Sequence, residues 1–154
     1  MTVTPDELLE IKDRLEIQEL MNRYAEMVDQ RDWKIMDRIF ALEATIDYSS
    51  TGGHAGPFRE TLAWLDRALD SWPINLHFVT NLIIELDGDT ATARCYFHAP
   101  MARDTSDGSL YVVTNAGRYE DRLVRTSLGW RIIERICYQT LMQGKLPDGY
   151  QIPE

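Results

Sequence analysis

The first part of the chain repeats its apolar residues at the three- and four-residue spacing of helices. A first helix is predicted over residues 4–29, because Thr4 can cap it and Pro5 suits its first helical position. A short second helix is predicted over residues 31–40 and a third over residues 57–72. The first helix is expected to bury one apolar stripe, made of Leu8, Ile11, Leu15, Leu20, Met21, Tyr24 and Val28.

The second half of the chain changes to the two-residue period and the β-branched and aromatic composition of strands. Short glycine-containing turns separate these segments, so consecutive strands are predicted to form antiparallel hairpins. One earlier strand is predicted over residues 44–50, before a loop with three glycines. The later strands are predicted over residues 76–86, 90–103, 110–125 and 130–142.

The element order α-α-β-α-β-β-β-β groups helices early and strands late, which predicts an α+β fold. We expect the helices to pack on one face of a curved antiparallel sheet, with a ligand pocket against its concave face. No repeat or linker divides the 154 residues, so one domain is predicted over residues 1–154. Residues 144–154 are interpreted as a C-terminal tail, either frayed or packed on a neighbouring chain.

The composition, 44% hydrophobic and 27% charged, is typical of a globular protein with one core. Its 16 Lys and Arg against 25 Asp and Glu give a net charge of −9, which disfavours nucleic acid and anionic membranes as partners. A cytoplasmic protein is expected, since the sequence shows neither a signal-peptide pattern nor an apolar run of about 20 residues. Cys95 and Cys137 show no metal-ligand spacing and are expected to be reduced and buried.

Histidine is the first candidate for proton-transfer chemistry, and the chain has three. His77 begins an apolar strand, where alternation places it on the same face as Asn81. It is interpreted either as a core histidine or as a pocket residue. His98 lies within a later strand and faces either the pocket or an exposed edge, whereas His54 in the glycine loop is interpreted as a surface residue.

The chain resembles the SnoaL-like branch of the NTF2-like superfamily over residues 8–142. The motifs that carry the resemblance are Ile17-Gln18-Glu19-Leu20 with Tyr24 and Asp29 downstream, Trp33, Gly56-Pro57, His77 with Thr80-Asn81, and Gly129-Trp130. This branch includes scytalone dehydratase, the bile-acid 7α-dehydratases and hexachlorocyclohexane dehydrochlorinase. The resemblance implies a cone-shaped α+β barrel and a homo-oligomer, dimer or trimer, that pairs through the outer face of the sheet.

The resemblance also implies a catalytic dyad. In the lyases of this group an Asp at the end of the first helix pairs with a His on the strand after the third helix, and Asp29 and His77 match these positions. His77 would be the general base, with Asp29 fixing its tautomer. A Tyr five residues before the Asp, here Tyr24, would donate a hydrogen bond to a developing oxyanion or a departing hydroxide. The arginine of the bile-acid enzymes falls near Gln139, so that contact is expected to be missing.

These observations favour a cofactor-independent lyase or isomerase of the dehydratase type, acting on a small apolar cyclic compound such as a steroid, a polyketide or an aromatic. The sequence shows no metal-ligand cluster, phosphate loop, dinucleotide fingerprint or nucleophile elbow, so no cofactor and no metal are expected. A ligand-binding or accessory domain without catalysis is the alternative, and a polyketide cyclase is a further one. The pocket is expected to contain His98, Asn81, Tyr48, Trp64, Phe97 and Tyr111.

Overall fold

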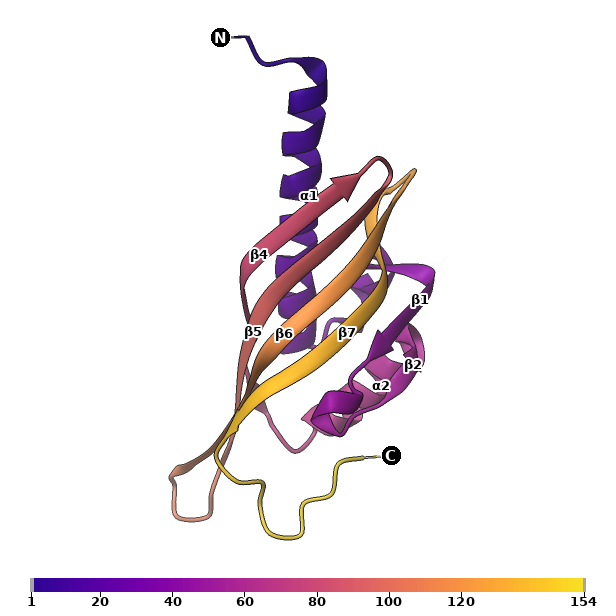
Figure 1. The fold of residues 1–154 in the computed structure, drawn as a ribbon. Coiled ribbons are helices and arrows are strands. Elements are labelled where there is room, and N and C mark those ends of the chain that lie inside the picture. The colour runs from indigo at the N-terminus through magenta and orange to yellow at the C-terminus, as the bar shows by residue number, and fades with distance from the viewer. Residues whose placement is uncertain (1, 154) are drawn as a thin grey trace.

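The computed structural model describes residues 2–153, in which two helices lie against a strongly curled sheet (Figure 1). The helices are α1 (Pro5–Gln30) and α2 (Phe58–Leu69), with two short 3₁₀ helices, η1 (Trp33–Arg38) and η2 (Ser49–Thr51). The strands are β1 (Phe40–Asp47), β2 (Ala55–Pro57), β3 (Ile74–Asn75), β4 (Phe78–Asp87), β5 (Thr90–Asp104), β6 (Leu110–Thr126) and β7 (Gly129–Gln143). The predicted α+β class is confirmed.

Within residues 2–153 the strands form one seven-stranded sheet in the order β2-β1-β7-β6-β5-β3, with β4 also paired to β5. The antiparallel hairpins from β4 to β7 are confirmed. The sheet as a whole is mixed, because β1 pairs with β7 in parallel. Parallel neighbours need a long connection, and the chain between β1 and β7 supplies one that contains α2 and the three hairpin strands.

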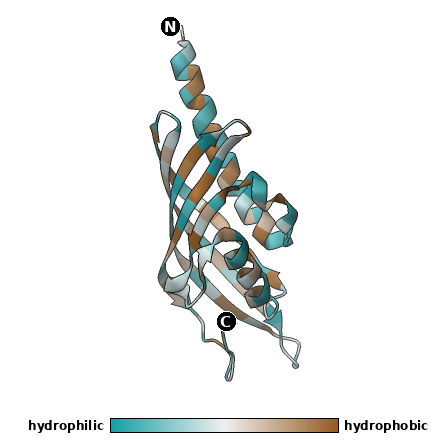
Figure 2. Cartoon of the chain, turned by 90° about the vertical axis from the view of Figure 1, so that its right-hand side faces the viewer, coloured by the Kyte–Doolittle hydropathy of each residue, from teal (hydrophilic) through white to brown (hydrophobic). Residues whose placement is uncertain are grey.

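The buried residues of α1 begin only at Asp13, so the prediction of one continuous buried stripe is wrong for its first turns. Thr4 caps the helix as predicted, since its Oγ1 accepts a hydrogen bond from the Glu7 backbone N–H at 3.2 Å. Leu8, Ile11 and Leu15, however, are each more than half exposed. A helix of 26 residues is about 39 Å long and extends past the ends of the strands (Figures 1 and 2). Its first turns therefore have no sheet to pack against.

The predicted second helix is shorter and tighter than expected. It is the 3₁₀ helix η1, and Phe40 already belongs to β1. The predicted third helix is α2, which begins after Pro57 and ends at Leu69, with Phe58 and Leu62 buried. No helix in the described part of the chain is both long and apolar enough to cross a membrane.

A buried ion pair lies in the core between α1 and the concave face of the sheet. The Arg135 guanidinium donates two hydrogen bonds to the Asp121 carboxylate, at 2.7 and 2.8 Å, and both side chains are fully buried. The guanidinium carbon lies 4.0 Å from the ring centroid of Tyr24 and 4.4 Å from that of Tyr119. Burial lowers the pKa of Arg135, but the charge and hydrogen bonds of Asp121 hold it well above the ordinary value. Arg135 is therefore a permanent cation inside the core.

We expect Arg135→Met to lower the free energy of unfolding by about 3–5 kcal/mol, because Asp121 would remain a buried charge without its partner. Arg122→Met is the control, since Arg122 is exposed and its nitrogen lies 3.6 Å from a Glu134 oxygen. This change is expected to cost less than about 1 kcal/mol. Urea unfolding followed by tryptophan fluorescence measures both variants. Equal losses in the two variants would contradict a special role for the buried pair.

Candidate active site

Asp29 and His77 meet where the last turn of α1 faces the residue that precedes β4. Asp29 Oδ1 lies 2.7 Å from His77 Nδ1, and Asp29 Oδ2 accepts a hydrogen bond from the His77 backbone N–H at 2.9 Å. The exposed fraction of the side chain is 9% for His77 and 17% for Asp29. One carboxylate therefore holds both the ring and the main chain of the histidine.

This contact determines which nitrogen of His77 is available to a ligand. With Nδ1 directed at the carboxylate, the neutral ring carries its proton on Nδ1 and its lone pair on Nε2. Among residues 2–153, Nε2 has no hydrogen-bond partner, and His77 lines a cavity. The arrangement leaves Nε2 able to accept a proton from a molecule in that cavity.

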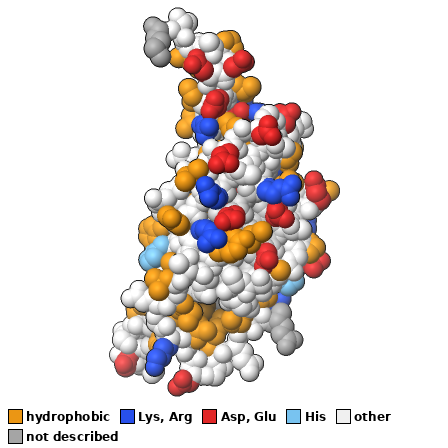
Figure 3. All heavy atoms as spheres, viewed as in Figure 1, with side chains coloured by type: hydrophobic (Ala, Val, Ile, Leu, Met, Phe, Trp, Pro, Cys, Tyr) orange, Lys and Arg blue, Asp and Glu red, His pale blue; other side chains and the backbone are white. Residues whose placement is uncertain are grey.

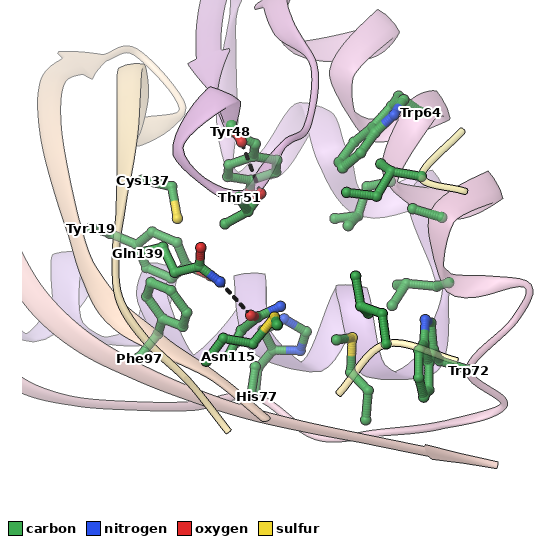
Figure 4. A pocket seen from close by; sticks show the side chains of 18 of the residues that line it. Tyr48, Thr51, Trp64, Trp72, His77, Phe97, Asn115, Tyr119, Cys137 and Gln139 are labelled. Carbon is green, nitrogen blue, oxygen red and sulfur yellow. Dashed lines mark hydrogen bonds between the residues drawn. The ribbon is translucent and has the colours of Figure 1, made fainter. Parts of the chain in front are cut away.

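The cavity has a volume of about 160 Å³ and lies between the concave face of the sheet, α2 and the C-terminal segment (Figure 4). Its walls are mostly apolar, with Trp64, Leu65 and Leu69 from α2 and Phe97 and Met101 from β5. The polar groups that reach it are few, as is typical of small-molecule sites. They come from Tyr24, Tyr48, Thr51, His77, Asn115, Tyr119, Gln139 and Tyr150, and from the Cys137 thiol.

A pair of hydrogen-bonded tyrosines forms one polar part of the lining. The hydroxyl groups of Tyr24 and Tyr48 contact each other, and both side chains are buried. Burial raises the pKa of each hydroxyl, so both remain protonated at neutral pH. Because one O–H donates to the other oxygen, the second O–H is left as a donor for a ligand. The tyrosine pair can thus stabilise negative charge that develops on an oxygen.

An amide pair forms a second polar part. Gln139 Nε2 donates to Asn115 Oδ1 at 2.6 Å, and both residues line the cavity (Figure 4). Asn115 was not predicted from the sequence. Gln139 was considered only as the position where the bile-acid enzymes have an arginine. Asn115 shares strand parity with Tyr119, so alternation along β6 places both on the inner face once that face is known. Gly117 stands between them, where any Cβ would clash with the Tyr138 carbonyl oxygen.

Cys137 also lines the cavity, but it is not activated. Burial raises its pKa to about 12, and burial raises the pKa of Cys95 to about 11. Both thiols are free and buried, as the sequence predicted. A thiol acts as a nucleophile only as the thiolate, so neither cysteine is suited to covalent chemistry at neutral pH.

The predicted pocket residues divide into two groups. Tyr48, Trp64 and Phe97 line the cavity. His98 does not, because strand alternation along β5 turns Phe97 inward and leaves His98 exposed on the outer face of the sheet, next to Phe78. The prediction that His98 lies in the pocket is wrong.

Asn81 also lies outside the cavity, and a β-bulge explains why. Thr80 pairs with Tyr96 and Ile83 with Arg94, so residues 81 and 82 together oppose one residue of β5. Asn81 takes the positive φ of 56° that this bulge requires, and its side chain is exposed. Simple alternation from His77 therefore fails at this point of β4.

Two further residues are not part of the lining, and one of them, Tyr111, was predicted to be. The Tyr111 hydroxyl donates to the Lys145 carbonyl oxygen at 2.7 Å, and its ring packs on Trp72, so Tyr111 supports the lining from behind. His54 Nδ1 lies 2.9 Å from Thr61 Oγ1, away from the cavity. In the described part of the chain, no three His, Cys, Asp or Glu side chains converge as metal ligands.

Comparison with known proteins relates the chain to one family. The model of the SnoaL-like domain matches residues 9–136. An uncharacterized protein of Mycobacterium tuberculosis is 39% identical over 137 residues, which cover 86% of this chain and 91% of that protein.

Solved structures share the fold. A protein from Novosphingobium aromaticivorans, provisionally named an aromatic ring hydroxylase, superimposes with a TM-score of 0.75 at 28% identity, covering 88% of this chain and 94% of that one. A type 2 hexachlorocyclohexane dehydrochlorinase has a TM-score of 0.75 at 17% identity, covering 94% of this chain and 99% of that one. At that identity the second likeness concerns the fold alone.

We expect both thiols of the native protein to resist iodoacetamide at pH 8, because pKa values of about 11 and 12 leave well under about 1% as thiolate. In urea their pKa values return to about 8.5, and both are expected to react. Intact-mass measurements before and after unfolding count the modified thiols. The variants Cys95→Ser and Cys137→Ser assign each reaction, and rapid alkylation of native Cys137 would contradict the prediction.

Proposed function

The chain belongs to the SnoaL-like domain family of the NTF2-like superfamily, and we propose that it is a cofactor-independent lyase or isomerase of the dehydratase type. Its substrate is a small apolar cyclic compound, within the range of aromatics, polyketides and steroids. The observation that carries the proposal is the Asp29–His77 contact of 2.7 Å, with the histidine at the lining of a mostly apolar cavity. The dehydrochlorinase of the same fold performs an elimination, as its name states.

The proposed reaction begins with proton transfer to His77. Nε2 removes a proton from a ring carbon next to a carbonyl or other electron-withdrawing group, and Asp29 stabilises the imidazolium that forms. The C–H electron pair moves into a new C=C bond as the C–O bond to the leaving group breaks. The departing hydroxide takes up this proton from the His77 imidazolium and leaves as water, which returns His77 to its neutral form. In an isomerisation the imidazolium instead returns its proton to another carbon.

The tyrosine pair serves the oxygen on which charge develops. The free O–H of Tyr24 or Tyr48 donates to an enolate oxygen or to the departing hydroxide. Burial raises the pKa of Tyr24, while the charge of Arg135 opposes that rise and strengthens the hydroxyl as a donor. Apolar walls around these groups lower the local dielectric, so each electrostatic contact is worth more than in water.

A binding or accessory role without catalysis is the second candidate. The fold is used for many purposes, and a fold alone does not determine activity. The observation that favours this candidate is the 28% identical structure provisionally named as an aromatic ring hydroxylase. On this alternative the chain is a carrier or a subunit that serves a larger oxygenase. In that case the cavity would hold a ligand without converting it.

We also propose that the chain forms a homo-oligomer through the outer face of the sheet. Phe78, Ile83, Tyr96 and Leu141 are each more than half exposed there. Figure 3 views this side of the molecule and shows patches of hydrophobic side chains with charged side chains between them. Exposed apolar side chains with polar residues around them are typical of protein–protein contact sites. A dimer or a trimer would cover these side chains.

His77→Gln and Asp29→Asn are each expected to lower kcat/KM by about 10²–10⁴-fold, because the first removes the base and the second its orienting charge. His98→Gln is the matched control, since it changes an exposed histidine and should leave the rate unchanged. Loss of water or another leaving group from candidate ring compounds is followed by mass spectrometry. Turnover that survives His77→Gln at the wild-type rate would refute the dyad.

For the interface, Phe78→Glu combined with Leu141→Glu is expected to shift the protein to monomer, because two buried charges per subunit would lie without partners. Leu8→Glu combined with Leu15→Glu on the free end of α1 is the control and should leave the oligomer intact. Light scattering during size-exclusion chromatography gives the mass of each. A wild-type protein that is monomeric at every concentration would contradict the interface but not the reaction.

A further inference from the structure

The C-terminal segment, residues 144–153, forms one wall of the cavity. The Trp64 indole N–H donates to the Pro153 carbonyl oxygen at 2.7 Å, and the Trp72 indole N–H lies 3.4 Å from the Tyr150 hydroxyl. The segment thus packs against its own domain. Three of its side chains line the cavity: Leu146, Tyr150 and Ile152.

The segment sets how large a ligand can be. With it in place the cavity measures about 160 Å³. An engineered apolar cavity of about 150 Å³ in another protein holds one benzene molecule. A single ring with a small substituent therefore fits within this volume, whereas a fused four-ring skeleton exceeds it.

The lining also disfavours a charged ligand. None of the described residues that line the cavity is Asp, Glu, Lys or Arg, and His77 is already directed at Asp29. The nearby cation, Arg135, does not line the cavity and is paired with Asp121, although its Nη1 has no hydrogen-bond partner among the described residues. Tyr24, Tyr48, Tyr119 and Cys137 remain neutral at physiological pH because burial raises the pKa of each. An ionised ligand would lose its hydration without gaining a counter-ion, which disfavours it.

The amide pair supplies the polar contact that an uncharged ligand needs. After the bond between them, Asn115 Nδ2 retains both of its N–H donors and Gln139 Oε1 retains its lone pairs. In the described structure these atoms have no other hydrogen-bond partner. A carbonyl group can accept from Asn115, and a hydroxyl group can accept from Asn115 and donate to Gln139.

We propose that the site takes an uncharged single-ring compound with a carbonyl or hydroxyl group, held by Asn115 and Gln139, and that Tyr150 and Ile152 set the size limit. This inference deepens the proposed function, since it names the substrate class for the same cavity. It requires binding only, so it holds equally for a carrier that converts nothing.

The test compares three probes on the full-length chain by ligand-detected NMR: benzamide, benzoate of the same shape, and progesterone as a neutral four-ring ketone. Benzamide is expected to bind at least tenfold more tightly than benzoate at pH 7.5, and progesterone to show no binding. Asn115→Leu is expected to weaken the binding of benzamide by about three- to tenfold, which is the effect of losing one neutral hydrogen bond. Gln139→Leu should act in the same direction.

The size limit is tested in Tyr150→Ala combined with Ile152→Ala, which is expected to gain progesterone binding while it keeps benzamide. Gln151→Ala is the matched control, because Gln151 is exposed in the same segment and should retain wild-type selectivity. The single variant Ile152→Ala, with a smaller gain expected, serves if the double variant does not fold by circular dichroism.

Two results would overturn the inference: progesterone binding by the wild type as tight as by the double variant, or benzoate binding as tight as benzamide. Failure of the proposed reaction would give a different experimental result from failure of this inference. Selective binding of benzamide together with no turnover of any neutral ring compound would remove the lyase and leave the ligand class standing. Turnover of a steroid by the wild-type protein would support the lyase and contradict the proposed ligand class.

Discussion

The cavity depends on one interaction beneath it, the buried ion pair between Asp121 and Arg135. The Arg135 guanidinium donates two hydrogen bonds to Asp121 on the neighbouring strand β6 and lies against the rings of Tyr24 and Tyr119. The desolvation cost of this charge is offset only while the carboxylate and both aromatic faces stay in place. The pair thereby connects α1 to the sheet and holds Tyr24 where its hydroxyl meets Tyr48. It supports the floor of the site without entering it.

Three groups of residues around the cavity have separate roles. The dyad joins the end of α1 to the start of β4, and one carboxylate holds both the ring and the main chain of His77. The tyrosine and amide pairs supply neutral hydrogen bonds to oxygen. Apolar side chains from α2, β5 and the C-terminal segment exclude water and charge. Together they form a site suited to moving a proton on an uncharged molecule, and poorly suited to chemistry that needs an ionised substrate.

Prediction from the sequence succeeded where a local pattern carries the information and failed where packing does. The strands from β4 to β7 follow from their two-residue period within two residues at each end. Asn81 and His98 were misplaced for different reasons. A bulge shifts Asn81 out of phase with His77, and nothing in β5 itself says whether the Phe97 or the His98 face turns inward. Asn115 was missed for the second reason.

The sequence by itself determined the α+β class, the boundaries of most elements and, through family resemblance, the pairing of Asp29 with His77. Periodicity is a property of neighbouring residues, so it reports that a strand has two faces and a helix has a stripe. Only the tertiary structure decided which face encloses the cavity, that Tyr48 reaches Tyr24, and that residues 146–152 close one wall. These outcomes depend on contacts between distant segments, whose energies are set by shape and by the burial of charge, and no local pattern encodes them.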